Sequence, residues 1–297
     1  MDGPYPSKRG TIAAVSGSTG DHETKEDDQQ NESNHCPKIK RQIGVFSQGM
    51  RRILHHFGAY CLLMKRAFQK PGRSREYGKA LAREIDYLGL DSVAIVGIIS
   101  LFVGAVVTIQ TALNLDDPFI PDYYIAIATR ESIILEFSPT MVSLILAGKV
   151  GSNIASTLGT MRVSEQIDAL EVMGVNSASY LVMPKVLASM LFNPILIMLS
   201  MGLGLLGGYI AGNLTGVIST PDYLLGIQLG FKPFYITYAM TKTVVFAFLI
   251  TSISAYYGYT VKGGAVEVGT SSTRAVVSSS VAVIVANYFL TQILLGT

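Results

Sequence analysis

Residues 147–174 read AGKVGSNIASTLGTMRVSEQIDALEVMG, and this stretch decides how the rest of the chain is interpreted. Its first half is rich in small residues, and its second half is abruptly charged. Apolar segments of membrane length lie on both sides of it. A charged segment between two membrane spans faces water, because the hydrocarbon core penalises charged groups. The stretch is therefore predicted to form a short helix outside the membrane, where a partner can reach it.

The composition points to a helical membrane protein. Of the 297 residues, 49% are hydrophobic and 15% are charged, against about 25% charged residues in soluble domains. Several apolar runs exceed the length of about 18 residues that crosses the hydrocarbon core. These runs are continuous, whereas a membrane barrel needs alternating strands of about ten residues. We predict an all-α polytopic membrane protein.

Five spans are expected, at about 92–113, 124–148, 184–212, 234–258 and 274–296. Twelve Lys and Arg residues lie between positions 38 and 83, directly before the first span. The positive-inside rule then places the N-terminal side of the chain in the cytoplasm. Five crossings put the C-terminus on the opposite side.

The part before the first span is predicted to have two regions. Residues 1–37 carry seven acidic and three basic residues with few aromatic ones, a composition typical of a disordered tail. Residues 38–91 are expected to hold amphipathic helices at the cytoplasmic interface. Within 42–70, apolar residues recur at spacings of three and four, and basic residues occupy other faces. This pattern predicts an interfacial helix on an anionic leaflet; the alternative is a helix packed on the bundle or on a partner.

The charged half of the opening stretch has helix-end signals. Ser164 suits an N-cap, Asp168 falls in the first turn, and Gly174 suits the C-terminal stop. Ile167 and Leu170 share one side of this helix. A helix of about ten residues is marginal in isolation. The residues alone leave two alternatives open, a solvated loop helix and a helix that docks on a partner.

Charged residues occur within the second span. Arg130, Glu131 and Glu136 lie there, with Pro139 close behind. A charge in hydrocarbon costs at least about 2.5 to 3.5 kcal/mol, so such residues face a protein interior or a wet cavity. Lys242 in the fourth span is a candidate partner for Glu136, either as a structural ion pair or at the margin of a transport cavity. Pro139 is expected to kink or interrupt the helix.

The remaining patterns are structural or absent. Gly204, Gly208 and Gly212 lie four residues apart in the third span, a row that lets helix backbones approach closely. The cysteines and histidines lack the spacing of metal ligands, so no metal site is predicted. The phosphate-binding motif G-x-x-x-x-G-K-[ST] does not occur, and the chain is not expected to hydrolyse ATP itself.

Three segments together resemble the signature of the MlaE (YrbE) type permeases, the membrane subunits of MCE-associated ABC lipid transporters. They are AGKVG at 147–151, LGTM at 158–161 and EQIDALEVMG at 165–174. The resemblance implies a coupling helix that docks on a cytoplasmic ATPase. Its residues would be Glu165, Gln166, Ile167, Asp168, Leu170, Glu171, Met173 and Gly174.

The segment EFSP at 136–139 resembles the family's Arg-Glu-Leu-Gly-Pro element. Leu135 stands where the family has Arg, and Arg130 is the nearest basic residue before it. Glu136 and Pro139 match this element. The residues expected in a lipid cavity or in the polar interior of the spans are Arg130, Glu131, Glu136, Pro139 and Lys242, although Arg130 and Glu131 could instead lie near the external interface.

The resemblance also implies partners and a location. It implies a homodimer in the bacterial inner membrane, a separate ATPase that binds ATP and Mg²⁺, a periplasmic MCE-domain protein and a phospholipid substrate. This chain itself would hold no cofactor, and no nucleic-acid partner is expected. Two other classes of protein are alternatives to the permease: a membrane-embedded enzyme that acts on lipid head groups through Glu136 and Arg130, and an ion-coupled secondary transporter.

Overall fold

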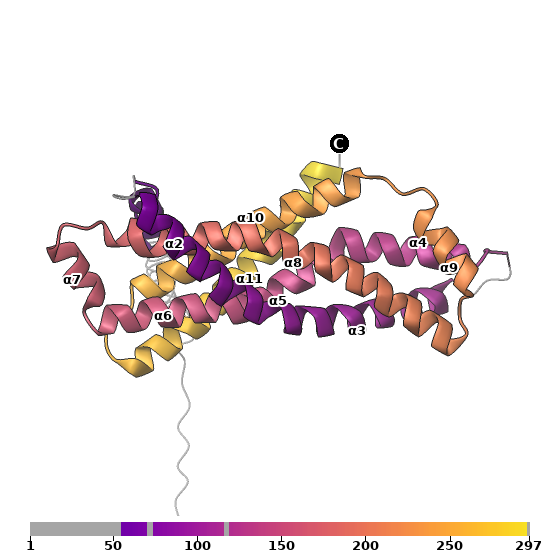
Figure 1. The fold of residues 1–297 in the computed structure, drawn as a ribbon, viewed down its shortest axis with the longest axis horizontal. Helices are drawn as coiled ribbons and strands as arrows, with labels where there is room; N and C mark the ends of the chain where they lie inside the picture. The colour runs from indigo at the N-terminus through magenta and orange to yellow at the C-terminus, as the bar shows by residue number, and fades with distance from the viewer. Residues whose placement is uncertain (1–54, 70–73, 116–118, 296–297) are drawn as a thin grey trace, which may run out of the picture. The chain divides into compact units, whose positions relative to one another are not determined.

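The computed structural model describes residues 55–69, 74–115 and 119–295, and every regular element in these ranges is helical (Figure 1). The chain divides into two compact units, Met1–Gly58 and Ala59–Thr297, and the spans belong to the second. The predicted disordered tail, 1–37, and the basic residues up to position 54 lie outside the described ranges.

Five helices of the second unit are long and apolar enough to cross a membrane, which confirms the predicted number of spans. They are Gly78–Asn114, Tyr123–Val163, Ser177–Thr215, Phe234–Tyr259 and Ala265–Leu294. The first begins within α2 (Ser74–Ile85) and continues through the π-helical segment η1 (Asp86–Leu90) and α3 (Asp91–Asn114). The last three are α8 (Ser177–Thr215), α10 (Phe234–Tyr259) and α11 (Ala265–Leu295).

The second span is one continuous helical run that changes its winding. It comprises α4 (Tyr123–Ser132), η2 (Ile133–Met141), α5 (Val142–Leu146), η3 (Ala147–Gly151) and α6 (Ser152–Val163), of which η2 and η3 are π-helical. Pro139 lies inside η2, so the proline changes the winding of the helix without interrupting it. π-helical turns of this kind occur frequently at functional sites.

This span continues fifteen residues beyond the predicted end at 148, as far as Val163. The reason is its small residues, which allow close packing beyond the apolar run. A Cβ atom on Gly151 would lie 2.8 Å from the Ser254 hydroxyl, and one on Gly159 would lie 3.0 Å from Val268. Ile154 and Leu158 of the same helix are fully buried.

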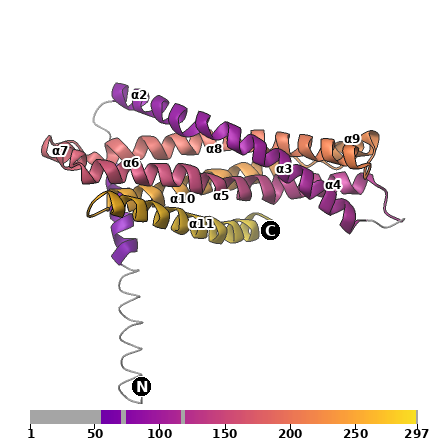
Figure 2. The same ribbon diagram turned by 90° about the horizontal axis from the view of Figure 1, so that it is seen from below.

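The first and third spans pack backbone to backbone (Figure 2). A Cβ atom on Gly104 of α3 would lie 1.8 Å from the carbonyl oxygen of Gly204, and one on Gly207 would lie 2.0 Å from that of Leu101. A Cβ on Gly208 would lie 2.3 Å from a hydroxyl of α3. The glycine row of α8 therefore lies where two helices meet at a distance that side chains would not allow.

The loop expected between the third and fourth spans contains a helix, α9 (Thr220–Gln228). Ser219 caps its first turn by accepting a hydrogen bond from the Asp222 backbone N–H, with Pro221 at the start. Tyr223 is buried and donates a hydrogen bond of 2.8 Å to the Leu205 carbonyl of α8. Since α8 joins α7 (Gln166–Val172) to α9, these two short helices lie at opposite ends of the bundle (Figure 1).

The helical residues before α2 that belong to this unit pack on the bundle. Leu63, Met64 and Ala67 are buried, and the Tyr60 hydroxyl lies 2.8 Å from that of Ser252 in α10. Phe68 is 55% exposed. Packing on the bundle was the alternative to a purely interfacial helix, and residues 59–69 show it; contact of this segment with the membrane surface stays a prediction.

Candidate functional site

The two intramembrane charges predicted as partners meet in the structure. The Lys242 ammonium in α10 donates a hydrogen bond of 2.7 Å to Oε1 of Glu136 in η2. Lys242 follows Phe234, the first residue of α10, by eight positions, or about 12 Å along the helix. The ion pair therefore lies well inside the membrane-spanning segment.

The Glu136 carboxylate also accepts hydrogen bonds from polar side chains of η2, α10 and α11. Asn287 donates to Oε2 over 3.1 Å and Thr291 to Oε1 over 3.3 Å, both from α11. Thr140 and the Tyr238 hydroxyl add contacts of 3.3 and 3.4 Å. Asn287, Thr291 and Tyr238 were not predicted from the sequence. The available signal for Asn287 and Thr291 was their spacing of four residues in the apolar second half of the last span.

The two members of the pair differ in exposure. The Lys242 side chain is 0% exposed, whereas that of Glu136 is 41% exposed at the surface of a single chain. A carboxylate at this depth is too costly to leave against lipid tails. The surface next to Glu136 is therefore one that water or protein covers in the membrane.

An apolar groove adjoins this cluster. It lies between α3 and the η2–α5 part of the second span and has a volume of about 520 Å³, within the range of small-molecule sites. Phe137, the neighbour of Glu136, is one of its walls, and Gln110 is its one polar lining residue. The other walls are Ile99, Phe102, Val103, Val106, Val107, Met141, Leu144 and Ile145. The groove can hold hydrocarbon and offers little to a polar ligand.

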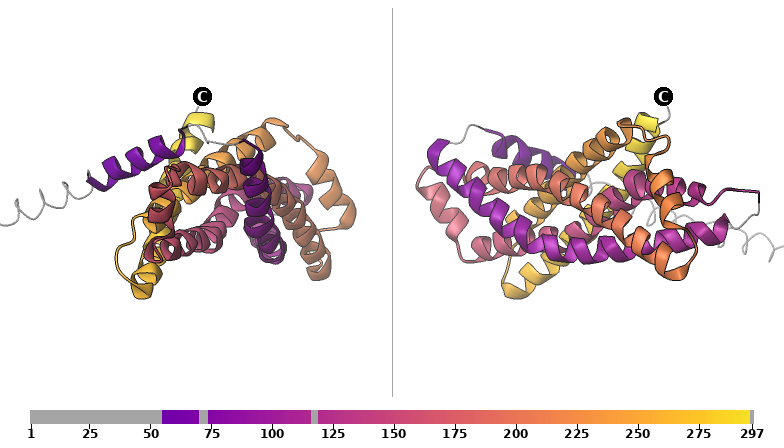
Figure 3. Two further views of the ribbon diagram at one scale, coloured as in Figure 1. Left: turned by 60° about the vertical axis from the view of Figure 1, so that its left-hand side comes forward. Right: turned by 45° about the vertical axis from the view of Figure 1, so that its right-hand side comes forward.

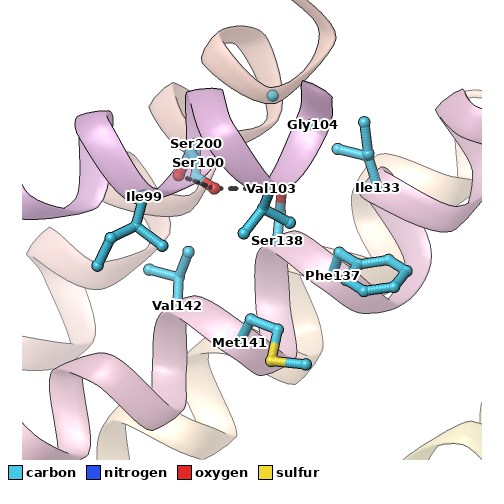
Figure 4. A pocket seen from close by; sticks show the side chains of 11 residues that line it. Ile99, Ser100, Val103, Gly104, Ile133, Phe137, Ser138, Met141, Val142 and Ser200 are labelled. Atoms are coloured by element: carbon cyan, nitrogen blue, oxygen red, sulfur yellow. Dashed lines mark hydrogen bonds between the residues drawn. The ribbon is translucent and has the colours of Figure 1, made fainter. Parts of the chain in front are cut away.

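A chain of buried serines joins three spans behind the groove (Figure 4). Ser100 of α3 donates to Ser200 of α8 over 2.8 Å, and Ser200 donates to Ser138 of η2 over 3.2 Å. All three side chains are buried. Hydrogen bonds between membrane helices fix their relative positions. Ser138 also precedes Pro139, so the serine chain holds the π-helical segment that carries Glu136.

Arg130 contacts the end of helix α9. Its NH1 donates to the carbonyl oxygens of Gly226, Ile227 and Leu229 over 3.2, 2.7 and 2.8 Å, at the C-terminal end of α9. The side chain is 1% exposed. Carbonyls at a helix C-terminus carry partial negative charge, which a guanidinium stabilises.

The remaining hydrogen bond of that guanidinium, 3.4 Å long, goes to Glu131. Among the described residues, no hydrogen bond or ion pair joins Arg130 to Glu136. The structure thus does not bring together the two site residues of the enzyme hypothesis, and a place for Arg130 in a lipid cavity stays a prediction. Lys242 supplies the positive charge beside Glu136.

The predicted coupling helix is present but begins later than expected. Helix α7 starts at Gln166, and Ser164 belongs to the end of α6, where its hydroxyl donates to the Thr160 carbonyl. Glu165 has a left-handed backbone with φ 59°. The predicted start at Ser164 is wrong because the chain turns sharply at Glu165 between α6 and α7, whereas Asp168 lies in the first turn of the helix as predicted.

The predicted end of the helix agrees with the structure. Gly174 has φ +76°, a conformation that glycine adopts without strain. Its N–H donates to the Glu171 carbonyl and that of Val175 donates to Leu170, each over 3.0 Å. These two bonds form a Schellman motif that satisfies the last carbonyls of α7.

The sides of α7 have different roles in packing. Ile167 is fully buried, whereas Val172 and Met173 are 89% and 68% exposed. The helix itself lies at one end of the bundle (Figure 3). Asp168 pairs with Arg162 of α6. Glu171 accepts hydrogen bonds from Ser177 and Tyr259, and these bonds hold the pKa of its carboxyl below the ordinary value. The helix is thus held from one side and presents apolar side chains on the other.

Comparison with known proteins identifies the family. The Permease MlaE family model matches residues 81–293. A probable ABC transporter permease of Rickettsia bellii is 32% identical over 82% of this chain and 93% of its own length. The probable ABC transporter permease slr1045 of Synechocystis is 36% identical over 71% and 80%. The intermembrane phospholipid transport system permease MlaE of Haemophilus influenzae is 27% identical over 75% and 85%. The chain belongs to the MlaE permease family.

Proposed function

We propose that this chain is the permease subunit of an ABC-type transporter that moves phospholipid between the inner membrane and the periplasm or outer membrane. The observation that carries the proposal is the family match over residues 81–293, with a relative whose name specifies phospholipid transport. The apolar groove beside the Glu136–Lys242 pair supports it, since a phospholipid needs room for hydrocarbon next to polar groups.

The proposed assembly is a homodimer. In a single chain the groove opens at the surface, and Glu136 is 41% exposed beside it. A second copy facing this surface would enclose a pathway and cover the carboxylate. Each copy would line one wall of the cavity with α3 and the second span.

A separate ATPase would bind at α7. The exposed Val172 and Met173 offer an apolar contact, and the sequence has no phosphate-binding loop of its own. ATP and Mg²⁺ would be held by that partner, so this chain would act as a transporter subunit rather than an enzyme. An MCE-domain protein would bind at the opposite end, where α9 lies.

These two partners imply an orientation of the chain in the membrane. The end with α7 would face the cytoplasm of a bacterium, with the N-terminus on that side and the C-terminus in the periplasm. Closure of the ATPases would move α7, narrow the cavity between the two permeases and drive lipid towards the MCE protein. The apolar groove would hold the acyl chains during this movement.

The test is affinity purification of the full chain in mild detergent, with mass spectrometry of the proteins and lipids that co-purify. We expect an ATPase with a phosphate-binding loop, an MCE-domain protein and phospholipid. The substitution Val172→Asp should remove the ATPase and keep the chain folded, whereas Leu214→Asp, at an 82% exposed position in the last turn of α8, at the end away from α7, should not remove it. Recovery of the chain without any ATPase would contradict the proposal.

A further inference from the structure

One carboxylate ties the short helix α7 to the ends of two spans. Oε1 of Glu171 accepts a hydrogen bond of 2.9 Å from the Ser177 hydroxyl and another of 2.9 Å from the Tyr259 hydroxyl. The two hydroxyl oxygens lie 2.8 Å from one another. Ser177 is the first residue of α8 and Tyr259 is the last residue of α10. The three residues are named the α7 latch below.

The electrostatics of this region favour the closed latch at neutral pH. The pKa of Glu171 is lowered by its hydrogen bonds to Ser177 and Tyr259 and, further, by the charges of Arg162 and Arg66. Glu171 is therefore ionised, and hydrogen bonds to a charged group are stronger than those between neutral groups.

The other contacts of α7 leave it dependent on this latch. The helix has seven residues, too few to be stable in isolation. Ile167 is its one buried residue, and the Asp168–Arg162 pair joins it to α6 at an exposed site, where ion pairs contribute little. Glu171 accordingly provides the link from α7 to α10.

Helix α10 is the element that carries Lys242. At 1.5 Å per residue, Tyr259 lies about 25 Å along this helix from Lys242. Lys242 in turn holds Glu136 in the π-helical segment beside the groove. A continuous path of helices and hydrogen bonds thus connects the helix end to the groove, and paths of this kind can carry coupling between distant sites.

We propose that the α7 latch passes movement of α7 to α10, and through Lys242 to Glu136 and the groove. Glu171, Ser177 and Tyr259 are in this view positioning residues, which couple the ATP-driven step to lipid movement. This inference rests on the proposed function. It also separates the residues at the end of α7 into two groups: Val172 and Met173 would contact a partner, and Glu171, itself exposed, accepts hydrogen bonds from the ends of α8 and α10.

The experiment uses the complete transporter reconstituted in liposomes, with ATP hydrolysis and phospholipid transfer measured on the same samples. The variants are Tyr259→Phe and Ser177→Ala, which each remove one hydroxyl and keep the carbon framework. Tyr180→Phe, at a half-exposed tyrosine of the first turn of α8, is the matched control. We expect ATP hydrolysis close to that of the unmodified complex and a loss of about three- to tenfold in lipid moved per ATP, the range that corresponds to the typical net contribution of one hydrogen bond.

Two outcomes would overturn the inference. An unchanged ratio of lipid to ATP in both variants would show that the latch transmits nothing. A parallel fall of hydrolysis, transfer and yield of assembled complex would show that the latch only stabilises the fold. If the unmodified complex hydrolyses ATP and moves no phospholipid, the proposed function itself fails.

A second readout does not depend on the substrate. A single cysteine at Thr241, an exposed position next to Lys242, reports movement of α10 through its rate of labelling, in a chain whose two native cysteines are replaced by serine. We expect ATP to change the labelling rate in the chain with the native latch residues. In the chain that also carries Tyr259→Phe, the change should be several-fold smaller. Equal changes with and without Tyr259→Phe, or no change in either, would contradict the inference.

Discussion

At the residue scale, the arrangement of charges explains what holds the site. Lys242 is completely buried, and the ammonium group depends on Glu136 for its neutralisation. Removal of one partner from a buried pair leaves the other charge uncompensated, which costs more than the pair itself contributes. Arg130 shows the same principle with different acceptors, because three backbone carbonyls take the place of a carboxylate.

The first prediction concerns this pair. Glu136→Ala should lower the free energy of unfolding by about 3 kcal/mol, the low end of the range for buried pairs because Glu136 is partly exposed. The double variant Glu136→Ala/Lys242→Met should recover most of this loss, since it leaves no unpaired charge. Thermal unfolding in detergent measures both. Equal stability of the single variant and the unmodified chain would contradict the assignment of Glu136 as the counter-ion of Lys242.

At the element scale, each short or irregular element is held by the contacts of one or a few side chains. Helix α9 is held by Arg130 and the buried Tyr223, helix α7 by Ile167 and Glu171, and the π-helical segment η2 by the serine chain. The long spans share the Ser100–Ser200 hydrogen bond as well, but glycine contacts and apolar burial bring them together. The functional parts of the chain are thus those in which single polar contacts decide the geometry.

A second prediction follows for α9. Arg130→Ala should release this helix, because three carbonyls lose their donor, and backbone hydrogen exchange over residues 220–231 should increase. Glu131→Ala, which removes only the 3.4 Å contact, should leave exchange in this segment unchanged. The assignment of Arg130 as the anchor of α9 would be wrong if both variants behaved alike.

A third prediction tests the contact of α3 with α8. Gly104→Ala would place a Cβ atom 1.8 Å from the carbonyl oxygen of Gly204. The two helices must then separate, and several kcal/mol of stability should be lost. Gly202→Ala is the matched control on α8, because nothing lies within 4 Å of its Cβ, and it should be neutral or stabilise the helix by up to about 1 kcal/mol. Similar unfolding temperatures of the two variants would contradict the close contact.

At the scale of the whole molecule, the sequence predicted the number of spans, the position of the coupling helix and the Glu136–Lys242 pair. Apolar length and charge depend only on composition, which explains this agreement. The features that the sequence did not show depend on tertiary contacts: the turn at Glu165 that delays α7, and the α9 carbonyls that bind Arg130. Helix α9 was missed although Ser219 and Pro221 signalled its start.

The same contacts set the mechanical organisation of the chain. The α7 end and the α9 end are joined by α8, and the Glu136–Lys242 pair lies between them in the membrane. In the proposed mechanism, a movement that begins at α7 would reach the pair and the groove through whole helices. This is the arrangement that the proposed coupling of ATP hydrolysis to lipid movement requires.

The most direct measurement is ATP-dependent transfer of a labelled phospholipid by the purified complex in liposomes, with an ATPase subunit that binds but does not hydrolyse ATP as the control. We predict transfer with the active ATPase and loss of transfer with the inactive one. A complex that hydrolyses ATP at a normal rate and moves no phospholipid would contradict the account.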